Sequence, residues 1–317
     1  MRTINLGLLQ IVKMDLEQKA IERIKTASEL SLHHYGKPLV CTYSGGKDSD
    51  VLLELFKRSG APFEAHNSHT TVDAPPTVYH IRQKFYELEL QGIKATIEKP
   101  TYKGKPVTMW TLIPQKGLPP TRLMRYCCQV LKETGCANRF IATGVRWDES
   151  NARKERDTYE AIGKSKKGAV RISDEIMLMN DNADKRRITE HCMKQNKMVT
   201  NPIIDWRHRD IWDFIQSENV TCNQLYECGY ERVGCVGCPL ANKGRWKEFS
   251  DFPTYQAAYI RAFDKMLDIL RSKGVQLQTW KNGYDVFSWW MEDKNIDGQY
   301  SMDFDGIDLA GFKEKGI

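Results

Sequence analysis

Two groups of residues in this 317-residue chain have the types and spacing that chemistry requires, and the first is a loop. It reads Ser44-Gly45-Gly46-Lys47-Asp48-Ser49 and lies between an apolar run and a helix-like stretch. Glycines let the backbone approach an anion, and the first turn of a helix offers unpaired N–H groups. Lys47 adds positive charge, the serines add hydroxyls, and Asp48 is suited to cap the helix or to hold Mg²⁺ with a nucleotide. The loop predicts a phosphate site, although its spacing is not that of a Walker loop; the alternative is an ordinary turn before a helix.

The second group consists of four of the nine cysteines. Cys127 and Cys128 are adjacent, and Cys235 and Cys238 form a C-x-x-C pair whose glycines are expected to make a tight turn with N–H groups directed at sulfur. Four thiolates from two segments suit Zn²⁺ or an iron–sulfur cluster, although an adjacent pair is unusual for zinc. Unliganded thiols or a redox pair are the third interpretation. Cys228, outside both pairs, is the best candidate for a spare reactive thiol.

Apolar runs and helical periodicity predict the elements that must position these groups. Strands are predicted at 39–43, 62–67, 93–97, 140–145 and 199–204, and helices at 15–35, 76–91 and 245–275. Their alternation predicts an α/β fold: a doubly wound, mainly parallel sheet with a C-terminal, mainly helical appendage. We expect a nucleotide-binding domain with the cysteine site over residues 1–240 and the appendage over residues 241–317.

Residues 150–175 are polar and predict a long loop. Between 161 and 172 this segment contains four basic residues and no acidic one, namely Lys164, Lys166, Lys167 and Arg171. The segment is interpreted either as a lid that clamps an anion or as a solvated basic loop, and its charge would also suit a nucleic acid.

Composition bounds the class of protein. The chain has 47 Lys and Arg against 41 Asp and Glu, a formal charge of +6, and 41% hydrophobic residues. These values exclude a disordered chain, a collagen-like chain and a simple nucleic-acid-coating protein. No apolar run approaches the roughly 20 residues of a membrane span, and the N-terminal residues do not resemble a signal peptide. We therefore expect a cytoplasmic protein with reduced thiols and no membrane partner.

Three further segments contain candidate site residues. Asp73 lies in the segment 71–77, where an acid after a parallel strand is well placed beside a nucleotide and a Pro-Pro turn is the alternative. The segment 201–215 contains residues expected to pack a helix, namely Trp206, Ile211, Trp212 and Ile215.

The third segment, 143–153, reads Thr-Gly-Val-Arg-Trp-Asp-Glu-Ser-Asn-Ala-Arg. Gly144 allows close approach at a strand end, and Arg146 and Arg153 can bind phosphate or sulfate oxygens through paired hydrogen bonds. Glu149 is expected to orient one of these arginines. A surface Arg–Glu pair of little energetic value is the alternative.

The loop at 44–49 resembles the pyrophosphate loop of the ATP pyrophosphatase superfamily. Together with the segments 71–77, 143–153 and 201–215, it makes the chain between residues 20 and 240 resemble the phosphoadenosine phosphosulfate reductase family. This resemblance implies an adenine nucleotide alpha-hydrolase-like fold and places ATP or an adenylyl sulfate on the loop, with Lys47, Asp73, Arg146 and Arg153 as catalytic residues. The four paired cysteines resemble the 4Fe–4S pattern of the adenylyl-sulfate reductase branch.

The resemblance leaves three functions open. Reductases of this family use a cysteine in a C-terminal E-C-G-[LI]-H motif, and no cysteine follows Cys238 in this sequence. This difference favours a sulfurtransferase similar to those of DNA phosphorothioation, with ATP, a sulfur donor such as a cysteine desulfurase, and a nucleic-acid acceptor. The alternatives are an iron–sulfur reductase that forms sulfite and a non-catalytic nucleotide-binding interaction protein.

Overall fold

The computed structural model describes residues 6–150, 153–154, 156–162, 170–172, 197–277 and 279–292. They group into two units. The sheet unit comprises residues up to 69, 75–98 and 134–234; the cysteine unit comprises 70–74, 99–133 and the residues from 235 onward. Both units are discontinuous in sequence, whereas the sequence predicts a single boundary after residue 240. The difference arises because residues 99–133 pack with the C-terminal helices, as the 2.6 Å hydrogen bond from Trp290 Nε1 to Pro120 O illustrates.

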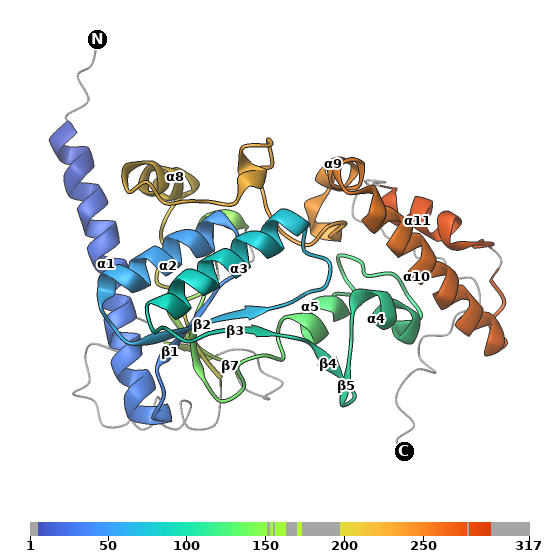
Figure 1. Ribbon diagram of the computed structural model, residues 1–317, viewed down its shortest axis with the longest axis horizontal. Helices are drawn as coiled ribbons and strands as arrows, with labels where there is room; N and C mark the ends of the chain where they lie inside the picture. Colours follow the sequence, from blue (N-terminus) through green and yellow to red (C-terminus); the bar gives the residue numbers. More distant parts are fainter. Residues whose placement is uncertain are drawn as a thin grey trace, which may run out of the picture. The chain divides into compact units, whose positions relative to one another are not determined.

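The sheet unit is built on seven strands in the order β3-β2-β1-β6-β9-β7-β8. Figure 1 labels β1, β2, β3 and β7 of this sheet. Their bounds are β1 Leu39–Thr42, β2 Phe63–Ser68, β3 Ala95–Glu98, β6 Phe140–Ala142, β7 Tyr159–Ile162, β8 Val170–Ile172 and β9 Lys197–Thr200. The first five strands in this order are parallel, and β7 pairs antiparallel with both β9 and β8. The predicted doubly wound, mainly parallel α/β fold is confirmed.

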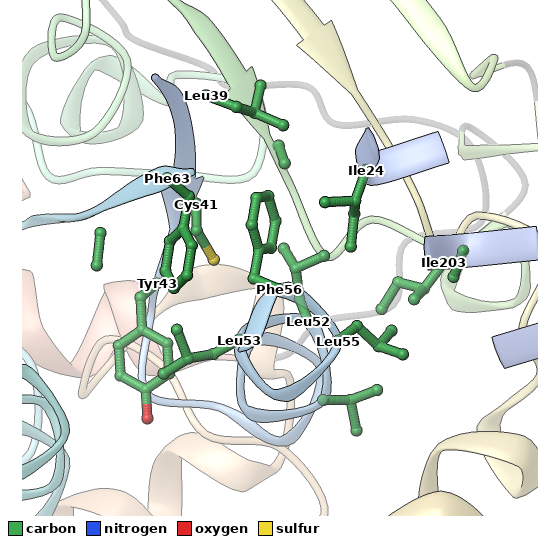
Figure 2. Close-up of a cluster of buried hydrophobic side chains, with 14 of the residues drawn as sticks. Ile24, Leu39, Cys41, Tyr43, Leu52, Leu53, Leu55, Phe56, Phe63 and Ile203 are labelled. Atoms are coloured by element: carbon green, nitrogen blue, oxygen red, sulfur yellow. The ribbon is translucent and has the colours of Figure 1, made fainter. Parts of the chain in front are cut away.

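Both faces of β1 are apolar because β1 lies inside the parallel sheet. Leu39, Cys41 and Tyr43 enter the larger core, where Phe56 packs with them (Figure 2). Val40 packs in a smaller cluster with Ile141 of β6 and Val199 of β9. The helices of this unit are α1 Leu6–Tyr35, α2 Lys47–Ser59, α3 Pro75–Leu90 and α8 His208–Ser217, with short 3₁₀ turns η1 Trp147–Glu149 and η3 Gln224–Tyr226. The chain therefore leaves a fully buried strand directly into the loop that precedes α2.

The segment 150–175 is not the continuous loop that its polarity predicts. It contains β7 and β8, and β7 joins the sheet through its pairing with β9. Tyr159 is buried, and so is the Glu160 side chain, which accepts a 2.8 Å hydrogen bond from Arg156 Nε. The expected basic residues Lys164, Lys166 and Lys167 lie outside the described residues, so the proposed anion clamp stays a prediction.

The cysteine unit is mainly helical. It contains β4 Thr101–Tyr102 and β5 Lys105–Pro106, the helices α4 Met109–Lys116, α5 Tyr126–Leu131, α9 Gly244–Asp251, α10 Pro253–Ser272 and α11 Gly283–Met291, and the turn η4 Pro239–Ala241. The single helix predicted at 245–275 is wrong, because the chain breaks at Phe252 and Pro253 begins a new helix. No helix in the described part of the chain is long and apolar enough to span a bilayer.

Candidate functional site

The loop between β1 and α2 has a shape that requires glycine. Gly45 adopts φ 74°, and a Cβ there would lie 2.9 Å from Ile81 Cγ1 and 3.1 Å from Thr77 Cγ2. Gly46 is the N-cap of α2. The loop is therefore pressed against the first turns of α3, which leaves no room for a side chain at position 45.

Hydrogen bonds within the loop leave some of its donors for a ligand. Ser49 Oγ donates to Gly46 O at 2.7 Å and accepts from Gly46 N–H at 3.1 Å, and Ser44 Oγ lies 3.3 Å from Ser49 Oγ. Within the described residues, the backbone N–H groups of Gly45 and Asp48 donate to no acceptor. The serine hydroxyls thus hold the loop in shape, while two N–H groups at the positive end of α2 are available to an anion.

Two buried cations meet on one carboxylate of the loop. Lys47 Nζ lies 3.2 Å from Asp48 Oδ2, and Arg146 Nε lies 2.7 Å from Asp48 Oδ1. Lys47 is 7% exposed and Arg146 is 2% exposed, and Arg146 also donates to Trp206 O. Gly144 permits this approach, because a Cβ there would lie 3.2 Å from the backbone of Asp48. The structure therefore brings Arg146 and Gly144 to the loop, where Asp48 is engaged by cations; the phosphate-binding role of Arg146 stays a prediction.

The second predicted arginine belongs to a wider group of positive charges. Glu149 accepts from the backbone N–H of Arg146 at 3.0 Å and forms an ion pair with Arg153. Burial lowers the pKa of Arg153, and the nearby charges of Arg232 and Arg156 lower it further. Sequence reasoning missed Arg156 and Arg232, since neither lies in the part of a motif that was assigned a role.

Two side chains far along the chain hold the loop, and sequence reasoning missed both. Asn223, 1% exposed, donates from Nδ2 to Gly45 O and to Thr77 Oγ1, both at 3.0 Å. The Tyr226 hydroxyl accepts from Lys47 N–H at 2.9 Å. Their only signal was that both lie within residues 20–240, over which the chain resembles the family. We call the segment from Asn223 to Tyr226 the strap.

The predicted packing role of segment 201–215 holds for all four residues, since Trp212 also packs against the main core. Trp206, Ile211 and Ile215 are buried, and Trp212 is half-buried. The Trp212 ring contacts the Tyr226 ring edge-on, with centroids 5.3 Å apart.

The turn at Cys235–Cys238 is fixed by aromatic rings in the cysteine unit. Gly237 adopts φ 74°, and a Cβ there would lie 2.5 Å from Phe249 Cζ. The Gly237 N–H donates to Glu248 Oε2 at 2.7 Å, and the Cys238 N–H donates to Cys235 O at 3.2 Å. The expectation that these N–H groups point at sulfur is therefore wrong, because protein oxygens already accept from both.

Asp73 lies in the cysteine unit, on a strand-like bridge to Cys235. Its carboxylate lies 3.8 Å from Cys235 Sγ and accepts from Thr70 N–H, and its carbonyl accepts from Tyr255 OH at 2.8 Å. The structure thus groups Asp73 with a cysteine; its expected role beside the nucleotide stays a prediction.

The four paired cysteines belong to the cysteine unit and affect one another's ionisation. Cys127 and Cys128 lie on α5, and a hydrogen bond between their side chains, followed by the Arg125 guanidinium, lowers the pKa of Cys128 to about 5. Arg125 Nη2 lies 3.5 Å from Cys128 Sγ. Burial raises the pKa of Cys235 to about 11 against the charge of Lys132. Arg125 and Lys132 therefore place positive charge among the thiols, and both flank the Cys-Cys pair in the sequence.

The arrangement of these thiols is looser than a ligand shell. Among the described residues, no group of three or more His, Cys, Asp or Glu side chains is arranged to hold a metal ion. The donor set itself, four cysteines with two basic neighbours in one unit, fits an iron–sulfur cluster or zinc by its chemistry.

The remaining cysteines differ in their surroundings. Cys41 is fully buried in the core, and Cys228 is exposed. Burial and the nearby charge of Asp50 together raise the pKa of Cys222 to about 12. Cys192 lies outside the described residues.

Comparisons with known proteins agree with this fold. Residues 38–241 match the model of the phosphoadenosine phosphosulfate reductase domain. An uncharacterized protein of Methanocaldococcus jannaschii is 28% identical over 82% of this chain and 54% of its own length, so the chain spans about half of that relative. The adenosine 5′-phosphosulfate reductase of Anoxybacillus flavithermus is 22% identical over 73% of this chain and 92% of its own. The U34-tRNA thiolase NcsA of Methanococcus maripaludis, solved with its [4Fe-4S] cluster, aligns with a TM-score of 0.38 at 14% identity over 82% of both chains.

Proposed function

Because the chain belongs to the phosphoadenosine phosphosulfate reductase domain family, we propose that it is an adenine-nucleotide-dependent sulfurtransferase. The observation that carries this proposal is the loop at the start of α2. It offers two backbone N–H groups to an anion and gathers two buried cations, Lys47 and Arg146, on one carboxylate. Such a site suits the phosphates of ATP, because backbone donors and fixed positive charges recognise phosphate oxygens together.

The loop would bind the part of ATP that leaves. An acceptor oxygen attacks the α-phosphorus and forms a new P–O bond, while the bond to the bridging oxygen breaks and pyrophosphate leaves with the electron pair. The N–H groups of Gly45 and Asp48 hold the pyrophosphate, and Lys47, Arg146 and Arg153 neutralise its growing charge. The terminal sulfur of a donor persulfide then attacks the activated atom, AMP leaves, and a thiol reductant cleaves the remaining S–S bond.

The cysteine unit would hold the metal group of this reaction. Cys127, Cys128, Cys235 and Cys238 would be its ligands, and Arg125 and Lys132 would offset the negative charge of four thiolates. When bound, a 4Fe–4S cluster would supply a place to hold or pass sulfur, and zinc is the alternative metal. A cysteine desulfurase as donor and a nucleic acid as acceptor remain part of this proposal.

A reductase that converts an adenylyl sulfate to sulfite is the second candidate. It is favoured by the adenosine 5′-phosphosulfate reductase of Anoxybacillus flavithermus, whose similarity to this chain extends over 92% of the relative.

One assay separates the two candidates. The protein is purified without oxygen and given ATP, adenylyl sulfate or its 3′-phosphorylated form, with and without DNA or RNA and a persulfide donor. A sulfurtransferase releases pyrophosphate from ATP in an acceptor-dependent way. Thioredoxin-dependent sulfite release from either sulfated nucleotide would show that the reductase interpretation is correct instead.

The ligand assignment is tested by the iron and sulfide content of two cysteine variants. We expect Cys238→Ser to lose most of the bound iron or zinc, because one of four ligands is removed. Cys228→Ser is the matched control, since Cys228 is an exposed thiol outside both pairs. Equal metal content in both variants would contradict the assignment.

A further inference from the structure

The Tyr226 hydroxyl occupies an unusual place at the start of α2. It accepts the N–H of Lys47, the first residue of the helix, at 2.9 Å. Its oxygen would lie 3.4 Å from a Cβ placed on Gly46, so the phenol lies directly against the loop. The neighbouring N–H groups of Gly45 and Asp48 donate to no acceptor among the described residues.

The Tyr226 hydroxyl also has a proton to donate. Within the described part of the chain, the hydroxyl forms one hydrogen bond, the one it accepts from Lys47. Burial raises the pKa of Tyr226, and the charges of Asp48 and Asp50 raise it further, so the phenol stays protonated at neutral pH. A phenol that accepts from one side can donate to an oxygen on the other.

Tyr226 is fixed in this position. Its ring packs edge-on against Trp212 at 5.3 Å, and Lys47 Nζ lies 5.8 Å from the ring centroid. Three residues earlier, buried Asn223 fastens the strap to Gly45 O and Thr77 Oγ1. A hydroxyl that merely covered the helix end would have to leave when an anion arrives, and these contacts hold it in place.

We propose that Tyr226 is a phosphate-binding residue at the start of α2. Its hydroxyl accepts a hydrogen bond from Lys47 N–H and donates one to a phosphate oxygen of the nucleotide bound at the loop. This inference rests on the proposed nucleotide site and adds to it a ligand contact supplied by the strap. Polarisation by the Lys47 N–H strengthens the donor, since hydrogen bonds in a chain reinforce one another.

The test compares Tyr226→Phe with the full-length wild-type protein, using calorimetric binding of inorganic pyrophosphate and of ATP. Phenylalanine keeps the ring contact with Trp212 and removes only the hydroxyl. We expect the dissociation constant for both probes to rise about 10-fold or more, the effect of losing one hydrogen bond to a charged acceptor. The matched control is Tyr86→Phe, which should bind both probes like wild type. Tyr86 is an exposed residue near the C-terminal end of α3. Thermal unfolding without ligand confirms that both variants fold.

The outcomes separate this inference from the proposed function. Tighter binding by Tyr226→Phe would show that the hydroxyl blocks the helix end, and unchanged binding would show that it is structural; either result overturns the proposal. Weaker binding with no pyrophosphate release from ATP would support Tyr226 as a ligand and contradict sulfur transfer. A wild-type protein that binds neither probe would overturn both.

Discussion

The loop of the sheet unit and the Cys235–Cys238 turn of the cysteine unit share one backbone conformation, but their N–H groups have different partners. Each is centred on a glycine with φ 74° whose Cβ position is filled by other elements. The loop is bounded by the buried aliphatic carbons of Thr77 and Ile81, and it keeps backbone N–H groups available. The turn is bounded by aromatic rings, and its Gly237 and Cys238 N–H groups donate to protein oxygens.

The two sites therefore obtain their chemistry from different parts of the chain. At the loop, the proposed anion contacts are backbone N–H groups, so the surrounding side chains must hold the shape of the loop without accepting from all of these groups. At the turn, the backbone only positions the sulfur atoms of Cys235 and Cys238. Its N–H groups can therefore form hydrogen bonds within the protein, which make the turn rigid. Substitutions at the two glycines should therefore affect different properties.

The largest expected effect is that of Gly237→Ala. The new Cβ would lie 2.5 Å from Phe249 and 3.1 Å from Trp290 and Tyr259, and these buried rings cannot easily retreat. We expect the free energy of unfolding to fall by about 3 kcal/mol or more, from overpacking and a strained φ together. Denaturant unfolding of the full chain, followed by tryptophan fluorescence, measures this change.

Gly274→Ala is the matched control for that prediction. Gly274 has φ 79° in the same unit but no atom within 4 Å of the Cβ position, so only the backbone cost of about 1 kcal/mol applies. Equal losses in the two variants would mean that the aromatic rings do not determine the rigidity of the turn.

Gly45→Ala should have a smaller effect on stability and a clear effect on binding. Its Cβ would meet Ile81 Cγ1 at 2.9 Å, a longer contact than the 2.5 Å at Gly237, so a smaller shift relieves the clash. We expect a loss of about 1–2 kcal/mol in unfolding free energy and about a 10-fold weaker affinity for ATP, measured by calorimetry. Gly60→Ala, with φ 66° and no neighbouring atom, should leave ATP binding unchanged. A Gly45→Ala protein that binds ATP normally would remove the proposed difference between loop and turn.

The smallest effect tests an ion pair of the sheet unit that touches neither site. Asp205 bonds to Arg23 at 2.8 Å and to Lys19 at 2.8 Å; burial opposes its ionisation, but these partners prevail and lower its pKa below the ordinary 3.8. The ionised form is thus stabilised by folding, a contribution present above pH 3.8 and lost as the pH falls through the lowered pKa. Asp205→Asn should cost about 1 kcal/mol at pH 7 and converge with wild type in acid. Its metal content should equal that of wild type; a loss of metal would contradict the comparison.

Local patterns were enough to predict the elements around the loop. One short stretch contains the buried strand at 39–43, the glycine turn and the apolar positions of α2. The hydrophobic periodicity of that stretch is therefore enough to predict all three. The same holds for α3, predicted at 76–91 and observed at Pro75–Leu90. The division of the predicted helix 245–275 was also readable, because Pro253 cannot continue a preceding helix.

Contacts between distant residues were not predictable in this way. Tyr226 bonds to Lys47 from 179 residues away, and Asn223 reaches Gly45 across 178 residues. No local period encodes such a pairing. Likewise, the polarity of 150–175 concealed β7, because this strand lies between β8 and β9 and its pairing with β9 depends on residues outside the segment. Asp73 followed a strand as predicted, yet its bridge to Cys235 depends on tertiary packing.

The long separation between the loop and its strap has a consequence for synthesis of the protein. A ribosome adds roughly 5 to 20 residues per second, so Tyr226 emerges roughly 10 to 35 seconds after Lys47. The parallel pairing of β1 with β6 must also wait for residues about 100 positions later. The phosphate loop is therefore among the first parts translated and among the last completed, and a nascent chain arrested before residue 226 would present it without the strap.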